Sequence, residues 1–145
     1  MNTNLLYQEL LHDHYQNPRH KGVISDATLV AELHNPSCGD SIAITGNVIH
    51  DGVQEVKFTG QGCVISQAAA SLLMEQLAGE SFETILGYDK GYMLQLLGIA
   101  LGPVRVKCAL LPLEAVQQAI RDYKIPSEQS HVGSNPFNAR VSEES

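Results

Sequence analysis

Three cysteines and one nearby carboxylate are the residues of this chain best suited to chemistry. Cys38 lies in an Asn-Pro-Ser-Cys-Gly-Asp segment that ends at Asp40, Cys63 follows Gly-Gln-Gly, and Cys108 follows a lysine. Three thiolates and a carboxylate form a four-ligand set, which suits Zn²⁺ or an iron–sulfur unit. Because the chain has no Cys-x-x-Cys pair, the fold must gather these ligands from distant positions.

The cysteines stand at expected junctions between elements. Cys63 directly precedes a predicted helix, and Cys108 is expected at or just before the last helix, with Pro112 in its first turn. The positive end of a helix dipole favours a thiolate at such a position, and Lys107 would add to this effect. Thiolate is the form that binds metal and attacks sulfane sulfur.

Asp40 predicts a site at which one of the metal ligands can be exchanged. A carboxylate is a harder and weaker ligand than a fourth cysteine would be, whereas structural zinc sites are commonly built from Cys and His alone. The alternative is that each cysteine is a small buried hydrophobic residue, that Gly-Gln-Gly is a simple turn and that Asp40 is a cap. The combination favours a metal or sulfur site, because every cysteine is expected at a junction between elements and none falls in an apolar helical stripe.

Composition restricts the class of protein. The 145-residue chain has 43% hydrophobic and 17% charged residues, as expected for one globular domain. Its net charge of −7 argues against a nucleic-acid partner. The first residues do not resemble a signal peptide, no apolar run is long enough to span a membrane, and an odd number of cysteines favours a reducing, cytoplasmic location.

The first half of the chain predicts one helix and a small sheet. Leucines at helical spacing indicate an amphipathic helix over 4–16, which the following Asn-Pro ends. Alternating residues predict strands over 28–34, 41–49 and 53–59, and Asp51-Gly52 is a hairpin signal between the last two. The expected result is a three-stranded antiparallel sheet.

The second half is predicted to be helical. A small-residue helix over 64–78 can approach the sheet closely, and Ser81 is expected to cap a short helix. Further helices are predicted over 91–101 and 113–124. The fold class is therefore α+β, with residues 1–125 as the domain and residues 126–145, rich in polar residues, as a mobile tail.

Over most of its length the chain resembles the IscU/NifU-type iron–sulfur scaffold family, and more closely its SufU branch. The resemblance rests on His-Tyr-x-Asn-Pro-Arg at 14–19, Asn-Pro-x-Cys-Gly-Asp at 35–40, Gly-x-Gly-Cys-x-Ile-Ser at 60–66 and Lys-Cys-Ala at 107–109. It implies an IscU/SufU-like fold with the helices on one side of the sheet.

The resemblance also implies roles. Cys38, Asp40, Cys63 and Cys108 would bind Zn²⁺ or a nascent 2Fe–2S cluster, with sulfur supplied as persulfide by a cysteine desulfurase. Cys38 would be the sulfur acceptor, as in the SufU branch, and Cys108 the alternative acceptor, as in the IscU branch. The product would pass to apo iron–sulfur acceptor proteins.

The chain mixes features of the two branches. Lys107 stands where the IscU branch has His, as in the SufU branch, yet the interval from Cys63 to Cys108 is too short for the SufU insertion. The segment from Leu101 partly matches one that an Hsp70-type chaperone recognises in IscU, with Gly102 and Arg105 departing from it. A chaperone is therefore a further candidate partner.

Three functions remain open at this point. The first is a scaffold and sulfur acceptor, a carrier without its own small-molecule turnover. The second is a zinc-dependent sulfurtransferase that activates a desulfurase without holding a cluster, and the third is a zinc-stabilised interaction domain. Among the histidines, His12 and His14 face different sides of a helix and are not expected to bind metal, and His14 is expected to be structural or a docking residue.

Overall fold

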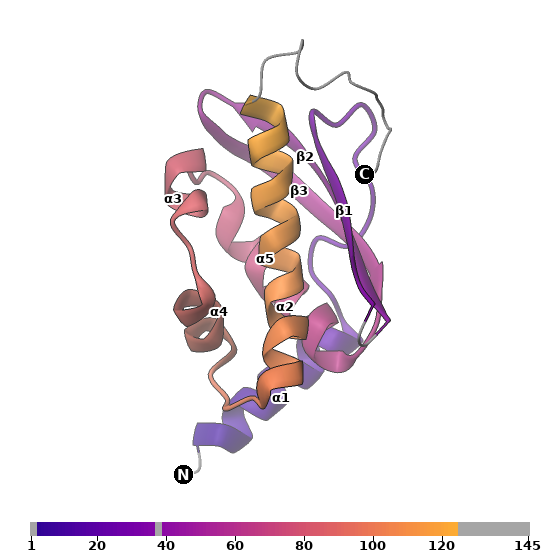
Figure 1. The fold of residues 1–145 in the computed structure, drawn as a ribbon, viewed down its shortest axis with the longest axis vertical. Helices are drawn as coiled ribbons and strands as arrows, with labels where there is room; N and C mark the ends of the chain where they lie inside the picture. The colour runs from indigo at the N-terminus through magenta and orange to yellow at the C-terminus, as the bar shows by residue number, and fades with distance from the viewer. Residues whose placement is uncertain (1–2, 37–38, 125–145) are drawn as a thin grey trace.

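The computed structural model describes residues 3–36 and 39–124. A three-stranded antiparallel sheet packs against helices on one of its faces (Figure 1). The strands β1 (Leu29–Asn35), β2 (Asp40–Ile49) and β3 (Gly52–Gln61) lie side by side in chain order. This arrangement confirms the predicted α+β fold class.

The sheet has one apolar face. Buried and partly exposed residues alternate along β2 and along the central part of β3, as the two-residue period of a strand requires. The buried side chains on this face include Ile42, Ile44, Val56 and Phe58. Helices must cover this face, because burying such side chains is the main favourable term in folding.

Two helices provide that cover. The helix α2 (Val64–Leu77) contacts β3, and α5 (Pro103–Lys124) contacts β1, β2 and α2. The Ala-Ala-Ala-Ser run at 68–71 is fully buried, and its small side chains allow the close packing that the sequence predicts. In Figure 1, α5 runs along the sheet, with the short helices α3 (Phe82–Leu86) and α4 (Lys90–Leu97) on its other side.

The first helix, α1 (Thr3–Gln16), packs against α2, and the segment after it closes the outer edge of β3. The Phe58 N–H donates to the carbonyl of His20 at 3.0 Å, and the Gly22 N–H donates to the carbonyl of Phe58 at 2.8 Å. The segment therefore satisfies strand groups that would otherwise form an open edge.

The last helix begins earlier than predicted. The expected start at residue 113, with Pro112 in the first turn, is wrong, because α5 begins at Pro103 and contains Pro112 in its interior. Proline is readily accepted in a first turn, and Pro103 occupies that place. Pro112 has no N–H to donate to the carbonyl of Cys108, and it is itself buried, so tertiary packing outweighs its poor helix propensity.

Two other boundaries differ from the predictions. The helix predicted over 91–101 is α4, which ends at Leu97 because Gly98 adopts a left-handed C-cap conformation with φ 75°. The β2–β3 turn consists of His50 and Asp51, since Gly52 already pairs with Ile49.

The predicted cap of α3 is confirmed by the Ser81 hydroxyl, which accepts the N–H of Thr84 at 3.1 Å.

The predicted tail over residues 126–145, and with it the domain boundary, lies outside the described residues. Within residues 3–36 and 39–124, no helix has both the length and the apolar character needed to cross a membrane.

A buried histidine fastens α1 to α2. His14 is 3% exposed, and its Nδ1 lies 2.7 Å from the hydroxyl of the fully buried Ser71. That hydroxyl also accepts the backbone N–H of Arg19 at 2.8 Å. A neutral ring with its hydrogen on Nε2 suits both contacts of the ring, because Nε2 lies 3.6 Å from a Glu75 carboxylate oxygen, which only accepts, and Nδ1 can then accept the Ser71 hydroxyl.

The surroundings of His14 disfavour its protonation. Burial is the main cause that lowers the pKa of His14 below its ordinary value, and the charge of Arg19 acts in the same direction. The carboxylates of Glu75 and Asp13 oppose these effects with smaller contributions. A second proton on the ring would also leave the Ser71 hydroxyl hydrogen without its acceptor in a buried position.

We expect the free energy of unfolding to fall as the pH decreases through about 6.5, the ordinary pKa of histidine. Below that pH the unfolded chain binds a proton at His14, whereas the folded protein does so only at lower pH. One such proton changes the free energy of unfolding by at most about 1.4 kcal/mol per pH unit. Urea unfolding between pH 8 and pH 5 measures the slope.

The variant His14→Asn removes the titrating ring while keeping an oxygen that can accept the Ser71 hydroxyl. The slope of its stability against pH should be shallower than that of the wild type. His12→Asn makes the same change at an exposed position of α1 and controls for its effect on the helix. Parallel curves for His14→Asn and wild type would contradict the interpretation.

Candidate metal centre

Asp40 is the first residue of β2 and lies on its helix-facing side. The left-handed conformation of Gly39, with φ 74°, lets the Gly39 N–H donate to the carbonyl of Asn35 at 2.8 Å, and Asn35 pairs with Asp40 in the sheet. The alternation along β2 places Asp40 on the same face as Ile42 and Ile44, and it is 1% exposed. The strand therefore carries a carboxylate into the space between sheet and helices.

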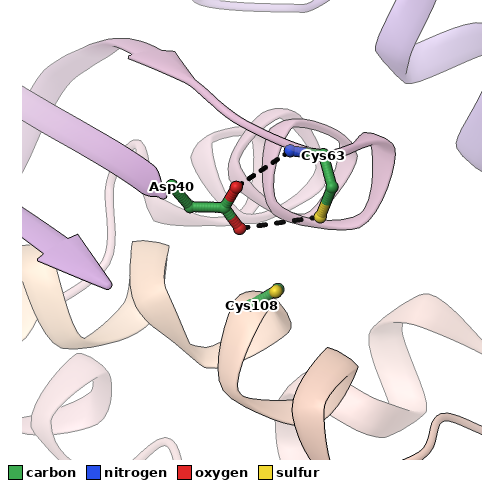
Figure 2. A group of neighbouring side chains, drawn as sticks. All are labelled: Asp40, Cys63 and Cys108. Carbon is green, nitrogen blue, oxygen red and sulfur yellow. Dashed lines mark hydrogen bonds between the residues drawn. The ribbon is translucent and has the colours of Figure 1, made fainter. Parts of the chain in front are cut away.

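Cys63 is the N-cap residue of α2 and receives that carboxylate. Its N–H donates to Asp40 Oδ1 at 3.0 Å, and its Sγ lies 3.6 Å from Asp40 Oδ2 (Figure 2). In a capping box, a carboxylate three residues into the helix accepts this N–H. Here a strand supplies the carboxylate, and the thiol makes no capping hydrogen bond of its own.

Cys108 approaches the same point from α5. Figure 2 shows its side chain directed towards Asp40 and Cys63. It is 2% exposed and lies in the second turn of the helix, since α5 starts at Pro103. The prediction that Cys108 stands at a helix N-terminus is therefore wrong, and the helix-dipole argument applies to Cys63 alone.

The geometry suits a small thiophilic ion. One ligand atom each from Asp40, Cys63 and Cys108 lies within 4.8 Å of the others. A tetrahedral zinc with bonds of about 2.0–2.3 Å places its donor atoms about 3.3–3.8 Å apart, so small side-chain rotations would close the set. Cys38, the predicted fourth ligand and sulfur acceptor, lies outside the described residues, so its roles stay predictions.

Gly62 makes room for the carboxylate. It has φ 147°, and a Cβ at this position would collide with the Asp40 carboxylate and lie 2.9 Å from Ser66 Oγ. From the sequence, Gly-Gln-Gly was considered only as a possible simple turn, and Gly62 was given no packing role. The available signal was the position of Gly62 directly before a candidate ligand, where close approach of the backbone is a usual reason for glycine.

Two buried polar residues of α2 lie behind Cys63. The Ser66 hydroxyl donates to the carbonyl of Cys63 at 3.2 Å, and Gln67 Nε2 donates to Ser66 Oγ at 3.3 Å. The sequence predicted a capping or packing role for Ser66 but gave no role to Gln67. A glutamine among small apolar residues at the start of a helix was the only signal for it.

The other candidate residues do not join the site. Among the described residues, Asp40, Cys63 and Cys108 are the only group of three His, Cys, Asp or Glu residues whose ligand atoms come together. His12 is exposed and His14 buried, which confirms that they face different sides of α1. His20, His34 and His50 are exposed and also lie outside this group, and Arg105 and Lys107 are exposed residues of the first turns of α5.

Comparison with known proteins identifies the family. Residues 6–130 match the NifU-like N-terminal domain. The chain belongs to this family. The zinc-dependent sulfurtransferase SufU of Bacillus subtilis (strain 168) is 36% identical over 136 residues, which cover 82% of this chain and 92% of the relative. The iron–sulfur cluster assembly scaffold protein IscU of Thermotoga maritima is 33% identical over 138 residues, with 84% of this chain and 97% of the relative covered.

Solved structures share the fold of this NifU-like domain. A protein of Fervidobacterium islandicum AW-1, assigned as an iron–sulfur cluster assembly scaffold for the SUF system, superposes with a TM-score of 0.67 at 27% identity, covering 82% of this chain and 99% of that chain. The N-terminal part of a NifU-like protein from Brucella abortus gives the same TM-score, 0.67, at 20% identity, with 79% and 92% covered. The second similarity concerns the fold alone.

We expect Gly62→Ala to disturb the site directly, because the added Cβ would displace the Asp40 carboxylate from the Cys63 N–H. The backbone conformation and the lost hydrogen bond should together lower the free energy of unfolding by about 1–3 kcal/mol. Zinc affinity should fall as well. Urea unfolding in the presence of a chelator and competitive zinc titration measure the two effects.

Gly102→Ala is the matched control, since a Cβ at Gly102 meets no atom within 4 Å. It should leave zinc affinity unchanged. Wild-type zinc affinity in Gly62→Ala would show that the position of the Asp40 carboxylate does not matter for the ion.

Proposed function

We propose that this NifU-like domain accepts persulfide sulfur from a cysteine desulfurase and serves as a scaffold on which a 2Fe–2S cluster is assembled. Cys38, Asp40, Cys63 and Cys108 are the proposed ligands, for the cluster as cargo and for zinc in the resting protein. The observation that carries the proposal is the convergence of Asp40, Cys63 and Cys108 within 4.8 Å.

Burial and exposure within this group support a loading site rather than a closed structural one. Asp40 and Cys108 are buried, at 1% and 2% exposed, whereas Cys63 is exposed. A cargo can therefore enter and leave from the Cys63 side while the other two donors remain fixed by β2 and α5. An oxygen donor among thiolates also binds soft metals less strongly, which favours exchange.

Each of the three described donors is held by a different element. Asp40 Oδ1 is engaged by the Cys63 N–H, which leaves Oδ2 directed towards the sulfur of Cys63. Cys63 lies at the N-terminal end of α2, where the unpaired backbone N–H groups of the helix favour an anionic cargo. Bound zinc would keep the thiols in their thiolate form and the ligand set assembled.

The proposed loading step is a thiol–disulfide-type exchange. A thiolate of this protein attacks the outer sulfur of the desulfurase persulfide and forms a new S–S bond. The S–S bond on the desulfurase breaks, and its cysteine leaves as a thiolate. We assign the attack to Cys38, with Cys108 as the alternative acceptor, because the resemblance to the SufU and IscU branches implies these two roles.

A second candidate is a zinc-dependent sulfurtransferase that activates a desulfurase without holding a cluster. The relative at 36% identity is a protein of that name, and Lys107 follows the pattern of that branch. Against it, the interval from Cys63 to Cys108 is too short to hold the insertion that the resemblance implies for that branch.

The partners follow from this chemistry. The proposal requires a desulfurase as donor and apo iron–sulfur proteins as acceptors, and an Hsp70-type chaperone remains a candidate for promoting release. Because the proposed thiol ligands must stay reduced, we place the protein in a cytoplasmic, reducing compartment.

The test is anaerobic reconstitution with a cysteine desulfurase, cysteine and ferrous iron, followed by visible absorption and zinc analysis. A scaffold should develop a 2Fe–2S spectrum as zinc is lost and should pass the cluster to an apo ferredoxin. Retained zinc, no visible chromophore and a faster desulfurase would favour the sulfurtransferase instead.

Persulfide loading without iron serves as the control for the sulfur step. Mass spectrometry should detect one added sulfur on the wild type and none on Cys38→Ser. Normal loading of Cys38→Ser would transfer the acceptor role to Cys108 or Cys63.

Asp40 offers a variant that separates its two contacts. Asp40→Asn keeps an oxygen for the Cys63 N–H but removes the anionic ligand, whereas Asp40→Ala removes both. We expect both variants to slow cluster transfer to an acceptor, because the exchangeable ligand is gone. Only Asp40→Ala should lose about 1–3 kcal/mol of unfolding free energy in the metal-free protein. Unchanged transfer rates in both variants would contradict the labile-ligand argument.

A further inference from the structure

The hydroxyl of Ser66 is the polar group of α2 that lies behind the sulfur of Cys63. Ser66 is fully buried, and its Oγ lies 3.2 Å from the Cys63 carbonyl and 4.0 Å from the Cys63 Sγ. The second distance is long for a hydrogen bond to sulfur. In the described conformation the Ser66 hydroxyl therefore donates to the Cys63 carbonyl, and the Cys63 sulfur lies beside it.

The Ser66 hydroxyl can donate its hydrogen either to the Cys63 carbonyl or to the Cys63 sulfur. The Cys63 carbonyl also receives the backbone N–H of Gln67 at 3.2 Å, so it keeps a partner if the hydroxyl turns away. Gln67 Nε2 donates to Ser66 Oγ at 3.3 Å, and Gln67 is itself 8% exposed. This donor holds the oxygen in place and polarises the O–H bond.

A hydrogen bond to an ionised acceptor is about twice as strong as one between neutral groups. When Cys63 is bound as a thiolate, its sulfur is a better acceptor than a carbonyl that already has a partner. We propose that Ser66 is a positioning residue that turns its hydroxyl from the Cys63 carbonyl to the Cys63 sulfur when that sulfur is a ligand. Gln67 orients it for this role. The inference rests on the proposed metal-binding function of the site.

Such a contact would tune the site without touching the ion. Hydrogen bonds to a ligand atom reduce its electron donation and fix its direction, and their removal commonly changes metal affinity 10–100-fold. Among the three described donors Cys63 is the exposed one, so the Ser66 hydroxyl would hold in place a ligand that packing restrains less than Asp40 or Cys108.

The experiment loads the full chain with Co²⁺ and, separately, with Zn²⁺. Ser66→Ala should move the sulfur-to-cobalt charge-transfer band to longer wavelength, because the thiolate becomes a stronger electron donor. It should also release zinc to a chelator about tenfold faster, because the Cys63 thiolate is no longer fixed in its direction towards the ion and this loss outweighs its stronger electron donation. Ser66→Thr, which keeps the hydroxyl, should restore both values towards the wild type.

Ser71→Ala is the matched control, because Ser71 is an equally buried serine of the same helix that bonds His14 and Arg19 instead of the site. It should lower stability while leaving the cobalt spectrum and zinc release unchanged. Identical spectra and release rates for Ser66→Ala and Ser71→Ala would overturn the proposal.

Two further outcomes distinguish a failure of the Ser66 proposal from a failure of the proposed metal site. If Ser66→Ala does not fold, Gln67→Met removes only the donor to the Ser66 oxygen and should shift the band in the same direction by a smaller amount, and an unshifted band would again overturn the proposal. A wild-type protein that binds Co²⁺ with no sulfur charge-transfer band would instead refute the proposed metal site.

Discussion

The contact between the Asp40 carboxylate and the N–H of Cys63 is the interaction on which the site depends. A carboxylate that is almost completely removed from solvent needs hydrogen bonds, because its desolvation is otherwise costly. The start of α2 supplies one of them, at 3.0 Å, and the helix in turn obtains a cap that its own sequence does not provide. One bond thus joins the first residue of β2 to the first turn of α2.

That bond imposes constraints on its neighbours. Gly62 can have no side chain, since a Cβ would occupy the position of the carboxylate. Gly60 is restricted separately, by the pairing of β2 with β3, because a Cβ there would collide with the carbonyl of Ser41 and the side chain of Ile42. The Gly-Gln-Gly segment therefore does more than turn the chain, because it allows strand and helix to approach closely enough for two ligands to meet.

The two cysteines of the described site have different environments, and this difference gives the site a buried side and an accessible side. Cys108 is held in the interior of α5, a helix fixed by its packing on β1 and β2. Cys63 lies at the exposed start of α2, with Ser66 and Gln67 behind it. A rigid buried half and an accessible half are what a site needs if it is to hold a cargo and then release it.

The amino-acid sequence by itself determined the α+β fold class, the three strands, α1, α2 and the set of candidate ligands. These features depend on alternation, helical spacing and turn residues, all of which act between neighbours in the chain. The family resemblance added the expected roles, and residues 6–130 confirm the membership.

Only the tertiary structure decided the start of α5, the end of α4 and the contacts within the site. A proline inside a helix is locally unfavourable, so Pro112 was read as a beginning, and burial of α5 against the sheet reversed that preference. The capping of Cys63 by Asp40, the space at Gly62 and the bond between His14 and Ser71 each join residues far apart in the chain. No local pattern encodes them, because they exist only once sheet and helices have packed.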